Sequence, residues 1–211
     1  MIQTDRKKEQ LRLIARIGVL SAVATILYFI EIPLWFAPAF YQFDLSDIVA
    51  LIGGMVWGPI PAFFIELIKN LIHLAVKGVA TAGVGELANF CVGVALTVPV
   101  SILMYRKKTL RRSILGAAVG TVVMVGVAAV LNYYVLIPFY ANVFGMDGIL
   151  YMAQEANANI TDLKSLILWA TTPFNLFKTV VDSILSILIF FRIRKFLLPE
   201  ESEQTAPEQE P

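Results

Sequence analysis

Residues 87–146 read LANFCVGVALTVPVSILMYRKKTLRRSILGAAVGTVVMVGVAAVLNYYVLIPFYANVFGM, and this stretch decides the fold. It holds two uncharged runs, 87–105 and 113–146, on either side of five basic residues. An uncharged apolar run of about 20 residues is long enough to cross a bilayer as a helix. Basic residues between such helices stay in the cytoplasm. The stretch therefore predicts two membrane helices that are joined by a cytoplasmic turn.

The composition of the whole chain also indicates a membrane protein. Of its 211 residues, 58% belong to the set AVILMFWYC and 16% are charged, and the mean hydropathy is +0.74. A soluble domain has about 25% charged residues. The net charge of +1 argues against a nucleic-acid partner. Cys91 is the one cysteine in the sequence, which excludes an internal disulfide and a cysteine-cluster metal site.

Basic residues mark the cytoplasmic side of the predicted helices. Thirteen of the 17 lysines and arginines form three clusters: Arg6, Lys7, Lys8, Arg12 and Arg16; Arg106, Lys107, Lys108, Arg111 and Arg112; and Arg192, Arg194 and Lys195. The uncharged runs between them lie at 17–30, 48–65, 87–105, 113–146, 165–177 and 183–191. The positive-inside rule places all three clusters in the cytoplasm. We therefore predict an all-α, polytopic six-transmembrane-helix bundle with its N- and C-termini cytoplasmic.

This arrangement also predicts the domain boundaries. Residues 1–198 form a single six-helix membrane domain, and residues 199–211 form an acidic tail. The tail holds five glutamates and two prolines after Pro199, a composition typical of a disordered segment. A cleaved signal peptide is the alternative for the N-terminus, but its removal would leave an odd number of helices.

Residues 47–77 must enter and leave the membrane within 31 residues, because the loop at 32–46 and the start of the run at 87–105 both lie outside. About 15 residues per crossing is short of the usual 20 or so. We predict two short helices with Trp57-Gly58-Pro59 as the inner turn. A re-entrant hairpin is the alternative.

Three asparagines occupy similar depths in the predicted helices. Asn89 lies 17 residues before Arg106, Asn132 lies 20 residues after Arg112, and Asn175 lies 17 residues before Arg192. At 1.5 Å per residue, these separations correspond to about 26–30 Å from the inner face. All three amides are therefore predicted at the outer ends of the fourth, fifth and sixth helices.

The sixth helix carries Asn175, Lys178 and Asp182 at i, i+3 and i+7, a spacing that puts them on one face. Asp182 lies one turn deeper than Lys178, so we expect it to neutralise the lysine. Polar residues in membrane helices are costly and mark functional sites, although hydrogen bonds between helices are an alternative use. An amide offers both a donor and an acceptor. We interpret the pattern as an outward-open pocket for a flat, neutral, hydrogen-bonding ligand.

The third helix carries Glu66, Lys69 and His73 near one face. An internal ion pair with a hydrogen-bonded histidine is one interpretation, and a proton relay is the other. The sequence holds one histidine and none of the motifs HExxH, GxxxxGK[ST] and GxSxG. It therefore predicts no zinc site, no ATP hydrolysis by this chain and no serine nucleophile. We expect no catalytic residues and no metal.

The first helix carries small residues at helical spacing. Gly18 and Ala22 form a G-x-x-x-A pattern, with Ala15 nearby. Such a face lets another helix approach closely. The neighbouring helix belongs either to this chain or to a partner.

Five motifs lie at separate places along the apolar part of the chain. They are FDLSD (43–47), ELIKN (66–70), GVGELANF (83–90), LNY (131–133) with Pro138, and PFNLFK (173–178). In this order and spacing they resemble the riboflavin-specific substrate-binding (S) subunits of energy-coupling factor (ECF) transporters. The resemblance extends from about residue 12 to residue 195, which is essentially the whole membrane region.

The resemblance implies a protein of the bacterial plasma membrane that captures riboflavin from outside, with no cofactor and no catalysis. It implies as partners a transmembrane coupling subunit and two cytoplasmic ATPase subunits that power release inward. The substrate-binding residues of the family map onto Asn132, Asn175, Lys178, Asn89, Gly85, Phe43 and Leu45. The docking surface for the coupling subunit maps onto Ala15, Gly18 and Ala22, where Gly18 replaces the more common alanine.

Two alternatives keep the membrane architecture and change the function. The first is an S subunit for a different vitamin. The second is a self-sufficient proton-coupled vitamin carrier with Glu66, Lys69 and His73 as its relay.

Overall fold

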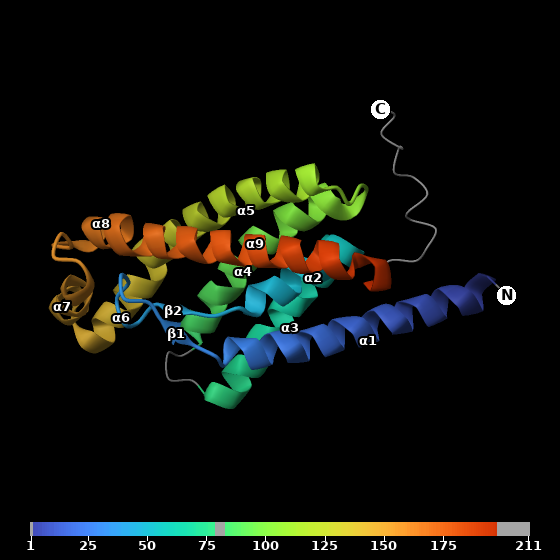
Figure 1. Ribbon diagram of the computed structural model, residues 1–211. Helices are drawn as coiled ribbons and strands as arrows, with labels where there is room; N and C mark the ends of the chain where they lie inside the picture. Colours follow the sequence, from blue (N-terminus) through green and yellow to red (C-terminus); the bar gives the residue numbers. More distant parts are fainter. Residues whose placement is uncertain (1, 79–82, 198–211) are drawn as a thin grey trace, which may run out of the picture.

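A computed structural model describes residues 2–78 and 83–197, with side chains from residue 6 onward (Figure 1). The predicted acidic tail at 199–211 lies outside the described residues. The single-domain boundary at residue 198 stays a prediction for the same reason.

The described elements are almost all helical. In chain order they are α1 (Ile2–Tyr28), β1 (Ile32–Pro33), β2 (Gln42–Phe43), α2 (Ser46–Trp57), α3 (Pro59–Lys77), α4 (Val84–Tyr105), α5 (Leu110–Leu131), η1 (Asn132–Leu136), α6 (Ile137–Phe144), α7 (Met146–Ala156), α8 (Leu163–Leu166), η2 (Ile167–Thr171) and α9 (Thr172–Leu197). Both η elements are π-helical. The prediction of an all-α protein is confirmed.

Among the described residues, four helical stretches are long and apolar enough to cross a membrane. They are Arg6–Tyr28, Pro59–Lys77, Val84–Tyr105 and Leu110–Phe144. The helix α2 is apolar but has only 12 residues, which corresponds to about 18 Å along its axis. Because the hydrocarbon core is about 30 Å thick, α2 is too short to span it unaided.

The helices lie side by side as an elongated bundle (Figure 1). The helix α4 contacts α2, α3 and α5, while α9 packs on α2 and α5. The hairpin β1–β2 and the short helices α6, α7 and α8 gather at one end, and the first turns of α1 and the last turns of α9 lie at the other (Figure 1). The molecule therefore has one end built from loops and short helices and an opposite end where the basic clusters lie.

The predicted turn at Trp57-Gly58-Pro59 is confirmed. Trp57 ends α2, Pro59 begins α3, and Gly58 between them has a φ of +98°. A side chain disfavours this φ, and a Cβ at residue 58 would also lie 2.7 Å from the Tyr105 ring. Glycine is therefore required for the close approach of this turn to α4.

Three features of the loop end were not predicted. Residues 32–43 form an antiparallel hairpin in which Ile32 pairs with Phe43 and Pro33 with Gln42. The helix α7 occupies part of the loop that follows the run at 113–146. The π-helical segments η1 and η2 interrupt the fifth and sixth predicted helices, and such segments commonly occur at functional sites.

The core of the bundle forms around α4. Leu51 and Met55 of α2, Leu96 and Val100 of α4, and Phe190 of α9 belong to one buried apolar cluster. On α5, Gly116 and Gly120 face this part of α4. A Cβ at these positions would lie 3.0 Å from the Val100 Cα and 2.8 Å from the Leu96 carbonyl oxygen, respectively. The two glycines therefore allow the backbones of α4 and α5 to approach closely.

Gly120→Ala is expected to lower the free energy of unfolding by about 1–3 kcal/mol, because the new methyl group overlaps the backbone of α4. Gly126→Ala on the same helix is the matched control, since nothing lies within 4 Å of a Cβ there. Denaturation in mild detergent, followed by far-ultraviolet circular dichroism, measures both variants. Equal stability of the two variants would contradict the close packing of α4 and α5.

Candidate ligand-binding site

A cavity of about 280 Å³ lies at the loop end of the bundle. Its walls come from the ends of α1, α3 and α5, the starts of α2 and α4, the hairpin, η1, α6 and α9. Five of the seven residues predicted to bind substrate line it: Gly85, Asn89, Asn132, Asn175 and Lys178. The structure therefore brings together the three asparagines that counting along the sequence placed at one depth.

The amides of Asn132 and Asn175 are held in place by the backbone of their own helices. Asn132 donates a hydrogen bond to the Ala128 carbonyl at 2.9 Å, and Asn175 donates to the Thr171 carbonyl at 2.8 Å. Asn132 is the first residue of η1, and Thr171 is the last residue of η2. An amide nitrogen has a second hydrogen, so each side chain keeps a donor for another partner.

Asn89 contributes a third amide to the cavity wall from α4. Its Oδ1 atom is buried, and no group in the described part of the chain donates a hydrogen bond to it. A buried acceptor without a donor is costly. The cavity therefore presents an acceptor that a hydrogen-bonding ligand or water would satisfy.

Tyr41 covers these amides from the hairpin loop. Its hydroxyl donates to Asn132 Oδ1 at 2.9 Å and lies 2.6 Å from the Thr171 hydroxyl, and its ring stacks on Phe174 at 5.1 Å. Burial raises the pKa of Tyr41 above its usual value, so the phenol keeps its proton and can donate it. Sequence reasoning missed this residue, because an aromatic residue in an outer loop carries no helical periodicity.

Phe43 and Leu45 do not line the cavity. Phe43 is buried with Ala37 and Phe174, and Leu45 packs at the edge of the same cluster. The ring of Tyr41 lies on the cavity wall instead. The structure thus places the two predicted loop residues behind the wall, where they support Tyr41 and Phe174.

Lys178 is buried and forms ion pairs with the start of α2 and the residues before it. Its Nζ atom lies 2.6 Å from Asp44 Oδ2 and 3.3 Å from Asp47 Oδ2. The expected pairing with Asp182 was wrong: in the part of the chain that the structure describes, neither carboxylate oxygen of Asp182 has a hydrogen-bond partner. The error arose because spacing within one helix does not report charges that the loop brings from elsewhere.

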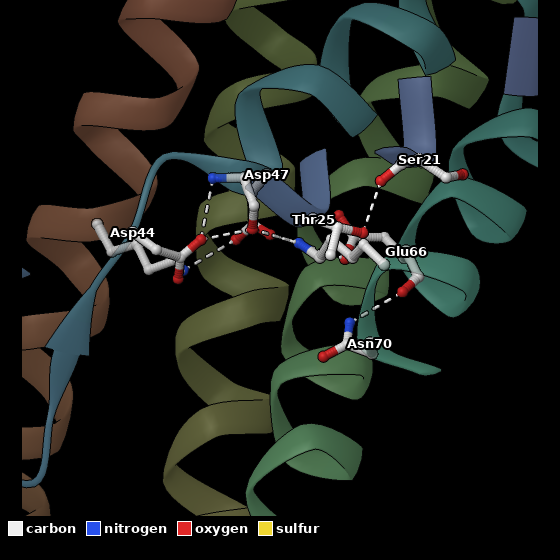
Figure 2. A network of polar contacts seen from close by, with 9 residues as sticks. Ser21, Thr25, Asp44, Asp47, Glu66 and Asn70 are labelled. Carbon is white, nitrogen blue, oxygen red and sulfur yellow. Dashed lines mark hydrogen bonds and ion pairs between the residues drawn. The ribbon is translucent and has the colours of Figure 1, made fainter. Parts of the chain in front are cut away.

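Lys69 extends this network into α3. Its Nζ atom pairs with Asp47, lies 2.8 Å from Glu66 Oε2 and donates to the Ser46 hydroxyl at 2.8 Å. We term the five charged residues of this network the charge cluster, and all of them are buried: Asp44, Asp47, Glu66, Lys69 and Lys178. Figure 2 shows Asp44 and Asp47 close together and Glu66 farther along the network. Of the two interpretations of this stretch, the internal ion pair is observed for Glu66 and Lys69.

His73 and Lys77 of α3 line another part of the cavity wall. The His73 ring stacks on Tyr28 at 3.8 Å, and its Nδ1 atom lies 3.3 Å from Glu86 Oε1 of α4. Lys77 forms an ion pair with Glu31, three residues after the end of α1. His73 and Lys69 therefore have different carboxylate partners.

Residues 12–190 match the family described as “ECF transporter, substrate-specific component”. The chain belongs to this family. A solved structure described as “Structure and mechanism of the S component of a bacterial ECF transporter” has a TM-score of 0.70 and 29% sequence identity. The match covers 90% of this chain and 99% of the solved chain.

Relatives of this S component include named transporters. The riboflavin transporter RibU of Staphylococcus aureus (strain TCH60) is 32% identical over 189 residues, which are 90% of this chain and 94% of that protein. The riboflavin transporter FmnP of Bacillus subtilis (strain 168) is 25% identical over 187 residues, which are 88% of this chain and 94% of that protein. The family and these relatives are transporters, which confirms that this S component is a membrane protein and not an enzyme.

The small-residue face of the S component points away from its own bundle. Ala15, Gly18 and Ala22 are exposed, and no atom lies within 4 Å of a Cβ built on Gly18. Ile17 and Ser21, on the other face of α1, are buried. Among the described residues, no helix of the same chain packs on this face at Gly18.

Lys69→Met is expected to destabilise the protein by about 3–5 kcal/mol, because it leaves buried carboxylates without their shared cation. Lys77→Met is the matched control on the same helix. It breaks an ion pair whose lysine side chain is 44% exposed, and such a pair contributes less than about 1 kcal/mol. Chemical denaturation of both variants tests this, and an equally small effect would contradict the role of the charge cluster.

Proposed function

We propose that this S component binds riboflavin from outside the cell and delivers it inward together with a coupling subunit and two ATPase subunits. The relatives named above are riboflavin transporters, and riboflavin carries a flat ring system edged by C=O and N–H groups. The observation that carries the proposal is the convergence of Asn89, Asn132 and Asn175 on one cavity. Their amides supply the donors and acceptors that such an edge needs.

The proposed topology has six helical crossings with both termini in the cytoplasm. The start of α1, the turn between α4 and α5 and the end of α9 hold the three basic clusters, and these parts lie at the same end of the bundle (Figure 1). The positive-inside rule assigns that end to the cytoplasm. The cavity, at the opposite end, then faces outside, where a vitamin is captured.

Lys178 is proposed to contact a ring carbonyl while it stays neutralised by Asp44 and Asp47. The ammonium group has three N–H donors, so it can pair with both aspartates and still offer one donor to a ligand. Gly85 lies on the cavity wall without a side chain, which leaves space for the ligand near the start of α4. The exposed face at Ala15, Gly18 and Ala22 is proposed to receive the coupling subunit.

Asn175→Ala is expected to weaken riboflavin binding about tenfold, because a buried hydrogen bond to the ring is lost. Asn142→Ala on α6 is the matched control, since Asn142 is exposed and lies outside the cavity wall. Quenching of flavin fluorescence measures both affinities. Equal riboflavin affinity of the two variants would contradict a role for Asn175 in binding.

Uptake is expected to depend on the partner subunits. Vesicles that contain only the purified chain should bind riboflavin but not accumulate it, with or without a pH gradient. Addition of the coupling subunit, the ATPases and internal ATP should start accumulation. Accumulation driven by the pH gradient alone would favour the self-sufficient carrier, and binding of a different vitamin in preference to riboflavin would overturn the proposed substrate.

A further inference from the structure

A second concavity, of about 920 Å³, lies at the end of the bundle opposite the ligand cavity. Its wall is made by the end of α2, the start of α3, the end of α4, the start of α5 and one residue of α1. Leu13, Ile60, Ile102 and Leu115 give it apolar sides. Except for Leu13, these side chains are exposed on the surface of helices long enough to span a membrane. We refer to this concavity as the basal groove.

Two arginines line the basal groove. Arg106 follows the end of α4 and Arg112 lies in the first turn of α5, and both belong to its wall. Within the described part of the chain, no carboxylate lies within 4 Å of either guanidinium. Arg16 adds a third guanidinium nearby, 5.4 Å from the centroid of the Trp57 ring, and Trp57 also lines the groove. The groove thus combines apolar walls with unneutralised positive charge.

The basal groove is separate from the small-residue face of α1. Leu13 is the groove residue on this helix, and Gly18 lies five residues further on, which corresponds to about 140° around the helix axis. A coupling subunit docked on the small-residue face therefore need not cover the groove. The groove therefore stays open to a smaller molecule, and lipids are always present in the membrane.

We propose that the basal groove binds one anionic phospholipid, with its phosphate at Arg106 and Arg112 and an acyl chain along the apolar wall. Guanidinium groups recognise phosphate through paired hydrogen bonds as well as charge. Basic pockets between membrane helices on the cytoplasmic side bind anionic headgroups in this way. The volume of the groove lies within the range of small-molecule sites, about 300–1,000 Å³, so it holds part of one lipid.

The test compares phosphatidylglycerol and phosphatidylcholine with identical acyl chains. Native mass spectrometry of the full chain in mild detergent, titrated with each lipid, gives the affinity. Arg106→Gln with Arg112→Gln is the groove variant. Lys107→Gln with Arg111→Gln is the matched control, because it removes the same charge from the same turn but changes no residue of the groove wall.

The wild-type chain is expected to prefer phosphatidylglycerol. The groove variant should bind it about tenfold or more weakly, because it loses the guanidinium hydrogen bonds to the phosphate, which charges elsewhere on the turn do not replace. The control should stay within about twofold of the wild type. A third variant, Ile60→Trp, fills the groove from an exposed position and should weaken binding without loss of charge. Circular dichroism confirms that each variant is folded.

Three results would overturn the proposal. Equal loss in the groove variant and the control would indicate general attraction to the basic turn. Equal affinity of the wild-type chain for both lipids would show that the groove does not recognise the anionic headgroup. Normal lipid binding but weakened assembly with the coupling subunit in the groove variant would assign the groove to that protein. None of these readouts depends on riboflavin, so the proposed function can fail or hold independently.

Discussion

Two buried lysines join the loop end of the molecule to its helices. Lys178 of α9 and Lys69 of α3 share Asp47, and each has one further carboxylate of its own, Asp44 and Glu66 respectively. An ammonium group in an apolar interior is tolerated only when it is paired, so these contacts constrain where the loop can lie. The start of α2, and with it the hairpin above, is thereby held against α3 and α9. The cavity wall depends on this attachment.

The cavity itself depends on irregular helix geometry. The π-helical segments η1 and η2 occur next to two of the cavity amides. Asn132 begins η1, and Asn175 follows the last residue of η2 by four positions. A π-helical turn holds one more residue per hydrogen-bonded ring than an α-helical turn, so it changes the direction of the side chains that follow it. Two such segments on facing helices turn polar side chains toward the same space without breaking either helix.

Counting residues from the basic clusters predicted the shared depth of the three asparagines, because depth in a straight helix is proportional to sequence separation. The local sequence identified the turn at Gly58, because glycine ends one helix and the proline after it begins the next. It could not identify the partner of Lys178. Asp44 lies 134 residues away, and no periodicity connects a loop residue with the sixth helix. The sequence analysis also did not predict the hairpin, α7 or the two π-helical segments. These elements depend on tertiary packing, which a local sequence pattern does not report.

The contact of Tyr41 with Asn132 has a consequence for the affinity of the cavity. The Tyr41 hydroxyl already donates to the amide oxygen of Asn132, and its ring stacks on Phe174. An aromatic ligand bound here, which we call the guest, would make similar contacts. An amide oxygen accepts two hydrogen bonds, so a guest at this oxygen either shares it with the phenol or needs Tyr41 to swing away. In the second case, the observed affinity is the intrinsic affinity reduced by the fraction of molecules in which Tyr41 has already moved aside.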